Sequence, residues 1–182
     1  MYEYSYFGYC ISLEMKGVIM ILEVKGIKKS FDKKEILHGI SFTVQSGKAM
    51  GFLGRNGAGK TTTFRCLMNV FKQTEGEFLL DGKPFDVNQN HIGYLPEERG
   101  MYAKVSLKDQ LAYFAKLKGA DNKKAAEEAE YWIDYFGLKD YTNKKLETLS
   151  KGNQQKIQIA QAFINDPAII ILGFRPSQRA NL

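Results

Sequence analysis

Short apolar runs bounded by glycine and polar turn residues recur along the chain from Met20 onward, and this pattern predicts β-strands. Strands are expected at residues 21–27, 40–44, 49–53, 77–80, 92–95 and 168–172. The third and the last of these runs are almost continuously apolar, which is typical of strands buried on both faces of a parallel sheet. The pattern therefore indicates an α/β fold with buried central strands.

Apolar residues spaced three and four apart predict helices in the second half of the chain. Ser106 and Asp109 match a capping box at the start of the first helix. The second helix should end at Gly137, because glycine readily adopts the left-handed conformation that follows a helix. A third helix is expected at residues 152–164 and should stop before Pro167, which cannot continue it.

Residues 1–19 differ from the rest of the chain, because tyrosines crowd them and their helical or core periodicity is weak. Aromatic and polar residues alternate over residues 2–6, which is compatible with an added edge strand. Alternatively, the segment is an extension ahead of a natural start at Met20, where a coherent strand pattern begins. We favour the extension, followed by one domain over residues 20–182.

Composition narrows the class of protein. The 26 basic and 20 acidic residues give a net charge of +6, and 44% of the residues are hydrophobic, as in a soluble globular domain. Basic residues are scattered among acidic ones, so no nucleic-acid partner is expected. The two cysteines cannot form a disulfide framework, which favours a reducing cytosol. The sequence has neither an apolar run of membrane-spanning length nor the pattern of a secretory signal.

Residues 54–61 match the phosphate-loop pattern G-x-x-x-x-G-K-[ST], between a predicted strand and a segment that can open a helix. Backbone N–H groups of such a loop curl around phosphate oxygens, and the helix N-terminus adds partial positive charge. Lys60 supplies a charge near the β- and γ-phosphates, and the Thr61 hydroxyl is placed to ligate Mg²⁺. The alternative is a glycine-rich turn with an incidental lysine. The residues expected to hold the nucleotide are Gly54, Arg55, Asn56, Gly57, Ala58, Gly59, Lys60, Thr61 and Thr62.

Residues 149–156 read Leu-Ser-Lys-Gly-Asn-Gln-Gln-Lys and open the last predicted helix, ahead of the last predicted strand. This segment resembles the L-S-G-G-Q signature of ATP-binding-cassette (ABC) proteins. Alone, it is equally compatible with an ordinary serine N-cap before a solvated helix face. Together with the phosphate loop, it makes the chain from Met20 to Leu172 similar to an ABC ATP-binding domain.

The resemblance implies a fold and an assembly. The fold is a three-layer P-loop NTPase architecture with a mainly parallel central sheet, a small antiparallel β subdomain and a helical subdomain that carries the signature. In this family two cassettes pair head to tail, and the signature of one completes the ATP site of the other. The resemblance therefore implies that Ser150 and Gly152 contact ATP held by a second subunit.

Two further positions carry over from the family. Residues 95–102 resemble the corresponding segment of bacterial ABC-2-type exporter subunits. Glu97 stands there in place of the glutamine that contacts Mg²⁺ in most cassettes, and the resemblance implies that this carboxylate is a metal ligand. Phe31 stands where the family stacks an aromatic ring on adenine. The alternatives are a solvated acidic turn for Glu97 and a packing role for Phe31.

The pattern departs from the family after Leu172. Family strands of this kind end in Asp-Glu, which orient Mg²⁺ and polarise the attacking water, whereas residues 173–182 contain no carboxylate. The family's switch histidine also has no counterpart, since His38 and His91 both precede the signature. We therefore identify no catalytic residue, and we expect that the last strands of the family's sheet are missing through truncation or deletion.

The resemblance leaves two functions open. In the first, the protein binds MgATP as the ATPase subunit that powers an ABC exporter, acting on a separate membrane-spanning permease at the cytoplasmic, inner face of the cell membrane. In the second, it is a truncated nucleotide-binding remnant that does not hydrolyse ATP and has no transport activity.

Overall fold

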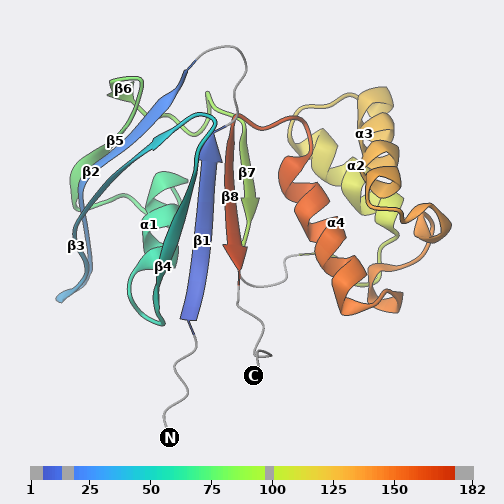
Figure 1. The fold of residues 1–182 in the computed structure, drawn as a ribbon, viewed down its shortest axis with the longest axis horizontal. Coiled ribbons are helices and arrows are strands. Elements are labelled where there is room, and N and C mark those ends of the chain that lie inside the picture. Colours follow the sequence, from blue (N-terminus) through green and yellow to red (C-terminus); the bar gives the residue numbers. More distant parts are fainter. Residues whose placement is uncertain (1–5, 14–18, 97–100, 175–182) are drawn as a thin grey trace, which may run out of the picture. The chain divides into compact units, whose positions relative to one another are not determined.

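The computed structural model describes residues 6–13, 19–96 and 101–174. The chain divides into two compact units (Figure 1). The first, here called the sheet unit, comprises Met1–Ile92 and Ala168–Leu182. The second, the helical unit, comprises Gly93–Pro167. Within the described ranges, no helix combines the length and the apolar character that crossing a membrane requires.

An antiparallel sheet of order β3-β2-β5-β6 forms one layer of the sheet unit. Its strands are β2 (Ile21–Phe31), β3 (Lys34–Gln45), β5 (Glu75–Leu80) and β6 (Lys83–Pro84). Leu22 and Val24 are buried while the residues between and beside them are more exposed, which is the period of two that a sheet with one solvated face requires. This is the small antiparallel β subdomain that the family resemblance implied.

The other sheet of this unit contains β4 (Ala49–Arg55), β1 (Tyr6–Leu13) and β8 (Ile169–Phe174) in that order. Next to β8 comes β7 (Ile92–Leu95), whose first residue belongs to this unit. The Ile169, Ile170 and Ile171 side chains are buried, as their apolar run predicted. Helix α1 (Lys60–Leu67) follows β4, and the Phe64 ring packs against the Phe52 ring of β4 with centroids 5.5 Å apart.

Strand β1 shows that part of the N-terminal segment belongs to the sheet. It lies between β4 and β8 and is paired with both, so it is a central strand and not an edge strand (Figure 1). The buried side chains Tyr9, Ile11 and Leu13 alternate with Cys10 and Ser12. The alternation over residues 9–13 is the sequence pattern that indicates this strand. The alternation over residues 2–6, on which the edge-strand alternative was based, lies mostly outside the described residues.

The direction of β1 also changes the character of the sheet. It runs antiparallel to β4 and to β8, so the sheet is mixed and not mainly parallel. Because both neighbours oppose β1, β4 and β8 run in the same direction without pairing with each other. The α/β class is as expected, and the antiparallel strand between the two apolar strands is one difference. The other is β4, which was expected to be buried on both faces: its residues alternate between exposed and half-buried, and Leu53 is 71% exposed.

The helical unit contains α2 (Leu107–Leu117), α3 (Asn122–Tyr135) and α4 (Lys151–Phe163), with short 3₁₀ turns at Lys139–Tyr141 and Leu146–Thr148. The predicted capping box is confirmed: the Asp109 N–H donates to Ser106 Oγ over 3.1 Å. Gly137 follows α3 with a φ of 68°, the left-handed conformation expected of it.

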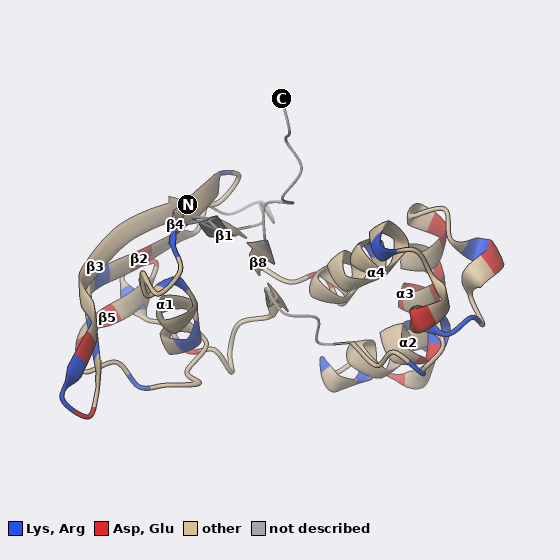
Figure 2. Cartoon of the chain, turned by 90° about the horizontal axis from the view of Figure 1, so that it is seen from below, with Lys and Arg blue, Asp and Glu red and all other residues tan. Residues whose placement is uncertain are grey.

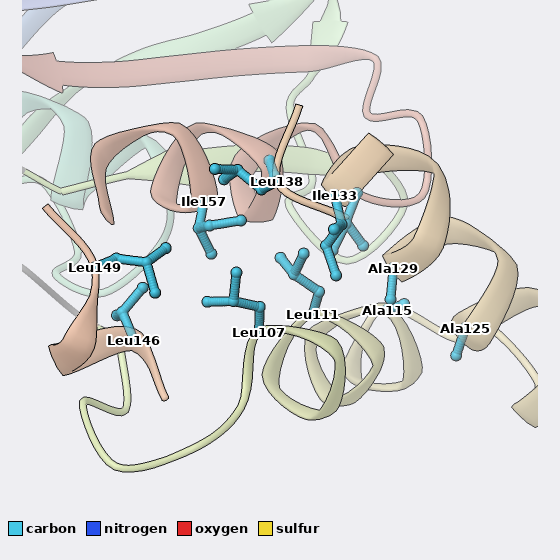
Figure 3. Packing of buried hydrophobic residues seen from close by; sticks show 12 residues of the cluster. Leu107, Leu111, Ala115, Ala125, Ala129, Ile133, Leu138, Leu146, Leu149 and Ile157 are labelled. Carbon is cyan, nitrogen blue, oxygen red and sulfur yellow. The ribbon is translucent and has the colours of Figure 1, made fainter. Parts of the chain in front are cut away.

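One apolar cluster joins these helices (Figure 3). Leu107 and Leu111 from α2 meet Ile133 from α3 and Ile157 from α4, and the exposed fraction of each is at most 1%. Leu146 and Leu149 close the cluster where the chain approaches α4. The residues spaced three and four apart in the sequence are therefore those that the helices bury.

A half-buried lysine caps the C-terminal end of α4. Lys118 Nζ donates to the backbone carbonyls of Gln161, Ala162 and Ile164 over 3.2 to 3.3 Å. Desolvation lowers the pKa of Lys118 to about 8, although the Glu128 carboxylate partly opposes the shift. The cation thus satisfies carbonyls that have no partner within the helix.

A test of β1 compares Ile11→Ala with Ser12→Ala. The Ile11 side chain is fully buried, so its truncation leaves a cavity and should lower the free energy of unfolding by about 2–5 kcal/mol. Ser12 points to the other face and is partly exposed, so its change should stay within about 0.5 kcal/mol. Urea unfolding of the full chain gives both values. Equal, small effects would contradict a central position for β1.

Candidate functional site

The candidate site is the loop that connects β4 to α1. Positive φ values of 80° at Gly57 and 83° at Gly59 let the backbone turn back over the helix N-terminus. Gly59 is the N-cap of α1, and no side chain accepts a hydrogen bond from the helix start. The first-turn N–H groups are therefore not satisfied by a side-chain cap, which suits the oxygens of an anion.

Lys60 lies inside this loop. Its exposed fraction is 5%, and Nζ donates to the carbonyl oxygens of Gly54 and Arg55, each over 2.8 Å. Carbonyl oxygens carry only partial negative charge, so they hold the ammonium without neutralising it. The structure thus brings together a buried cation and the N-terminal end of a helix, both of which attract an anion.

The remaining loop residues lie where the motif predicted. Asn56, Gly57 and Ala58 are exposed at the turn, where the Ala58 N–H donates to the Arg55 carbonyl over 3.2 Å. Thr61 and Thr62 follow Lys60 in the first turn of α1 and are half-buried. The strand, the loop and the helix are therefore arranged as the sequence indicated.

Tyr9 is a residue of this site that the sequence interpretation missed. Its hydroxyl donates to Thr61 Oγ1 over 3.4 Å, and its ring lies 4.7 Å from the Phe64 ring, centroid to centroid. The available signal was the apolar alternation around Ile11, which identifies a buried strand but not its neighbours. Strand β1, which is distant in sequence, therefore contacts the start of α1 through the Tyr9 hydroxyl.

Phe31 ends β2 at a tight turn that pairs it with Lys34. Its ring is 40% exposed, meets the Phe71 ring edge-on at 5.2 Å, and has the Lys29 ammonium 4.9 Å from its centroid. An exposed ring face is compatible with stacking on a base. The adenine role of Phe31 stays a prediction.

The signature residues Ser150 and Gly152 belong to the helical unit. Ser150 is the N-cap of α4, where Oγ accepts from the Asn153 N–H over 3.3 Å, and a Cβ added at Gly152 would meet nothing within 4 Å. Gln154 Nε2 donates to the Leu146 and Leu149 carbonyls over 3.1 and 3.0 Å. The Gln154 side chain therefore holds the turn that precedes α4. Glu97, the other predicted site residue of this half of the chain, lies outside the described residues.

Charges of both signs are mixed over each unit (Figure 2). Lys28 pairs with Glu75 over 2.8 Å in the sheet unit, and Lys108 pairs with Glu130 over 2.7 Å in the helical unit. These hydrogen-bonded pairs raise the pKa of Lys28 and lower the pKa of Glu130. Much of the basic excess is thus interleaved with acids on the described surface.

A cavity of about 460 Å³ lies in the sheet unit, lined by residues that follow or end α1, among them Cys66, Lys72 and Asp86. Burial raises the pKa of the Cys66 thiol. The lining contains none of the residues predicted to bind nucleotide. The phosphate loop is therefore not part of this cavity.

Strand β4, the glycine loop and α1 define a P-loop α/β fold. Residues 37–173 match the family model described as ABC transporter, and the chain belongs to that family. It is 43% identical over 153 residues to the uncharacterized ABC transporter ATP-binding protein YhaQ of Bacillus subtilis, covering 84% of this chain and 51% of the relative. It is 40% identical over 151 residues to the uncharacterized ABC transporter ATP-binding protein MJ1023 of Methanocaldococcus jannaschii, covering 83% and 55%.

The fold has solved counterparts. The structure of cbiO1 from Clostridium perfringens, part of the ABC transporter complex cbiONQ, aligns with a TM-score of 0.64 at 19% identity, covering 80% of this chain and 62% of that one. At such identity the likeness shows the fold. The chain spans about half the length of the curated relatives named above.

A matched glycine pair tests the loop geometry. Gly57→Ala and Gly59→Ala both place a side chain at positive φ, but a Cβ at Gly59 would also lie 2.5 Å from Leu37 Cδ2, whereas a Cβ at Gly57 meets nothing within 4 Å. Gly59→Ala should therefore lower the free energy of unfolding by more than Gly57→Ala, which carries only the backbone strain of about 1–2 kcal/mol. Chemical unfolding measures both, and the reverse order would contradict this packing.

Proposed function

We propose that the loop between β4 and α1 binds the phosphates of MgATP through Gly54, Arg55, Asn56, Gly57, Ala58, Gly59, Lys60, Thr61 and Thr62. The observation that carries the proposal is the Lys60 ammonium, buried in the loop on two carbonyl oxygens beside a helix start without a side-chain cap. The ATP-binding proteins named among the relatives support ATP as the nucleotide.

The donor set fits a magnesium ion carried by the nucleotide. No group of three or more His, Cys, Asp or Glu side chains that could hold a metal occurs in the described part of the chain. Mg²⁺ at nucleotide sites commonly takes one or two protein ligands and completes its shell with phosphate oxygens and water. We assign the Thr61 hydroxyl as one such ligand and Glu97 as the second, the latter from its place in the sequence.

Two more contacts complete the proposed site. The Phe31 ring is assigned to adenine, supported by its exposed face at the end of β2. Ser150 and Gly152, at the open start of α4, are assigned to the ATP of a second ABC subunit in a head-to-tail dimer. Helix starts of this kind favour anions by the same dipole and N–H groups that act in the phosphate loop.

In this proposal the protein is the ATPase subunit of an ABC transporter and acts on a separate membrane-spanning permease subunit. Its place is the cytoplasm, peripheral to the inner face of the cell membrane. Family membership and the relatives' names support the subunit assignment. The direction of transport is proposed as export, of the ABC-2 type, from the segment 95–102 alone.

A second candidate is a nucleotide-binding protein without hydrolysis. It is favoured by the absence of Asp and Glu from residues 173–182, the first two of which, Gly173 and Phe174, end β8. Hydrolysis needs a group that orients the attacking water as well as one that holds the metal. The two candidates share the binding step and differ in turnover.

Lys60→Ala tests the binding step. Removing the ammonium should weaken MgATP binding at least tenfold, about 1.4 kcal/mol, because a charge-assisted contact to phosphate is lost. Lys48→Ala is the matched control, since Lys48 is an exposed lysine of the same unit in the turn before β4. Calorimetric titration of the full chain measures the dissociation constants. Identical values for wild type and Lys60→Ala would refute the assignment of the loop.

Turnover separates the two candidates. Losing a positioned general base typically costs about 10²–10⁴-fold in rate, so the candidate without hydrolysis predicts phosphate release from this chain no faster than from its Lys60→Ala variant. A coupled phosphate assay on purified protein measures both rates. A wild-type rate that the Lys60 change abolishes would favour the ATPase and indicate that another carboxylate, first Glu97, orients the water.

A further inference from the structure

Tyr9 connects the N-terminal strand directly to the phosphate loop. Its side chain is fully buried, and its hydroxyl donates to Thr61 Oγ1 over 3.4 Å. Tyr9 lies in β1, whereas Thr61 is the second residue of α1. The contact therefore joins two segments that only the tertiary structure brings together.

The position of this hydroxyl is determined by the packing around it. On either side of β1, the Tyr9 backbone faces Phe52 of β4 and Gly173 of β8. The Tyr9 ring lies against the Phe64 ring at 4.7 Å, and Phe64 in turn contacts Phe52. Two strand ladders and an aromatic contact thus hold the phenol, so its O–H reaches Thr61 at no further cost in side-chain entropy.

The chemistry of Thr61 gives the contact a consequence. A hydroxyl oxygen has two lone pairs, so accepting a hydrogen bond and ligating a metal are not mutually exclusive. Threonine rotates between staggered positions about χ1, and a hydrogen bond from Tyr9 selects one of them. Mg²⁺ requires near-octahedral ligand geometry, so a ligand held in one orientation costs less to order.

We propose that Tyr9 is a positioning residue of the nucleotide site, which holds the Thr61 hydroxyl in the orientation that ligates the Mg²⁺ of MgATP. The inference rests on the proposed function of the loop. It makes the N-terminal strand part of the site and not only of the sheet. It also separates two roles of Tyr9: the ring packs, and the hydroxyl orients.

Tyr9→Phe isolates the second role, because it removes the hydroxyl and keeps the ring on Phe64. Calorimetric titration of the full chain with ATP is carried out once with excess Mg²⁺ and once with EDTA. We expect about 2–10-fold weaker binding with Mg²⁺, the range that one hydrogen bond supplies, and an unchanged dissociation constant with EDTA. Tyr113→Phe, at an exposed tyrosine of α2, is the control and should change neither value.

A double-mutant cycle with Thr61→Ala shows whether the effect passes through Thr61. In the Thr61→Ala background the Tyr9 change should have no further effect on MgATP binding. Thr61→Ala also tests the contact without a change in β1. Because it removes the proposed ligand itself, it should cost at least as much Mg²⁺-dependent affinity as Tyr9→Phe does. Thermal unfolding of each variant confirms that the proteins compared are folded.

The outcomes distinguish this inference from the function on which it rests. A loss that is equal with Mg²⁺ and with EDTA, or persists in Thr61→Ala, would overturn the positioning role, and so would no loss at all. If wild type binds MgATP and Lys60→Ala weakens it, those results leave the loop assignment intact. Absence of MgATP binding by wild type would overturn the proposed function and this inference together.

Discussion

The two backbone ladders of β1 are the interactions on which the sheet unit depends. β4 and β8 do not pair with each other; each is paired with β1, residue by residue, from opposite sides. A buried strand must satisfy its N–H and C=O groups within the protein, because an unpaired group away from water is costly. β1 therefore gives one edge of β4 and one edge of β8 their partner, and keeps the phosphate loop attached to a continuous sheet.

The loop itself is held from two directions. On one side, the Phe64 ring of α1 packs against the Tyr9 and Phe52 rings, so the helix start is fixed relative to β4, the strand that precedes it. On another side, Leu37 of β3 occupies the space that a Cβ at Gly59 would need. Close packing of this kind fixes the helix end of the loop, as pre-organised recognition of a phosphate requires.

The helical unit is stabilised by an apolar core of its own and by capping of both ends of α4. The buried residues of its apolar cluster lie between Leu107 and Ile164, so the unit has a core of its own. Ser150 caps α4 at one end, and Lys118 satisfies the carbonyls at the other. The start of α4 is thereby ordered without its glycine being covered by a neighbouring side chain, which leaves the signature segment accessible.

Local patterns in the sequence were sufficient for the helices, for most of the strands and for the motif. Caps, turns and periodicity are local properties, so these features follow from residue types a few positions apart. They are the helix start at Ser106, the helix stop at Gly137, the apolar strand at 169–172 and the strand–loop–helix around Lys60.

The place of β1 was decided only in the tertiary structure. An alternation such as that of Tyr9, Ile11 and Leu13 indicates a strand with one buried face, but it does not say which strands pair with it or whether both of its edges are paired. The pairing with β4 and β8, the antiparallel direction and the contact of Tyr9 with Thr61 arise from segments far apart in the chain, whose meeting depends on the packing of the whole unit.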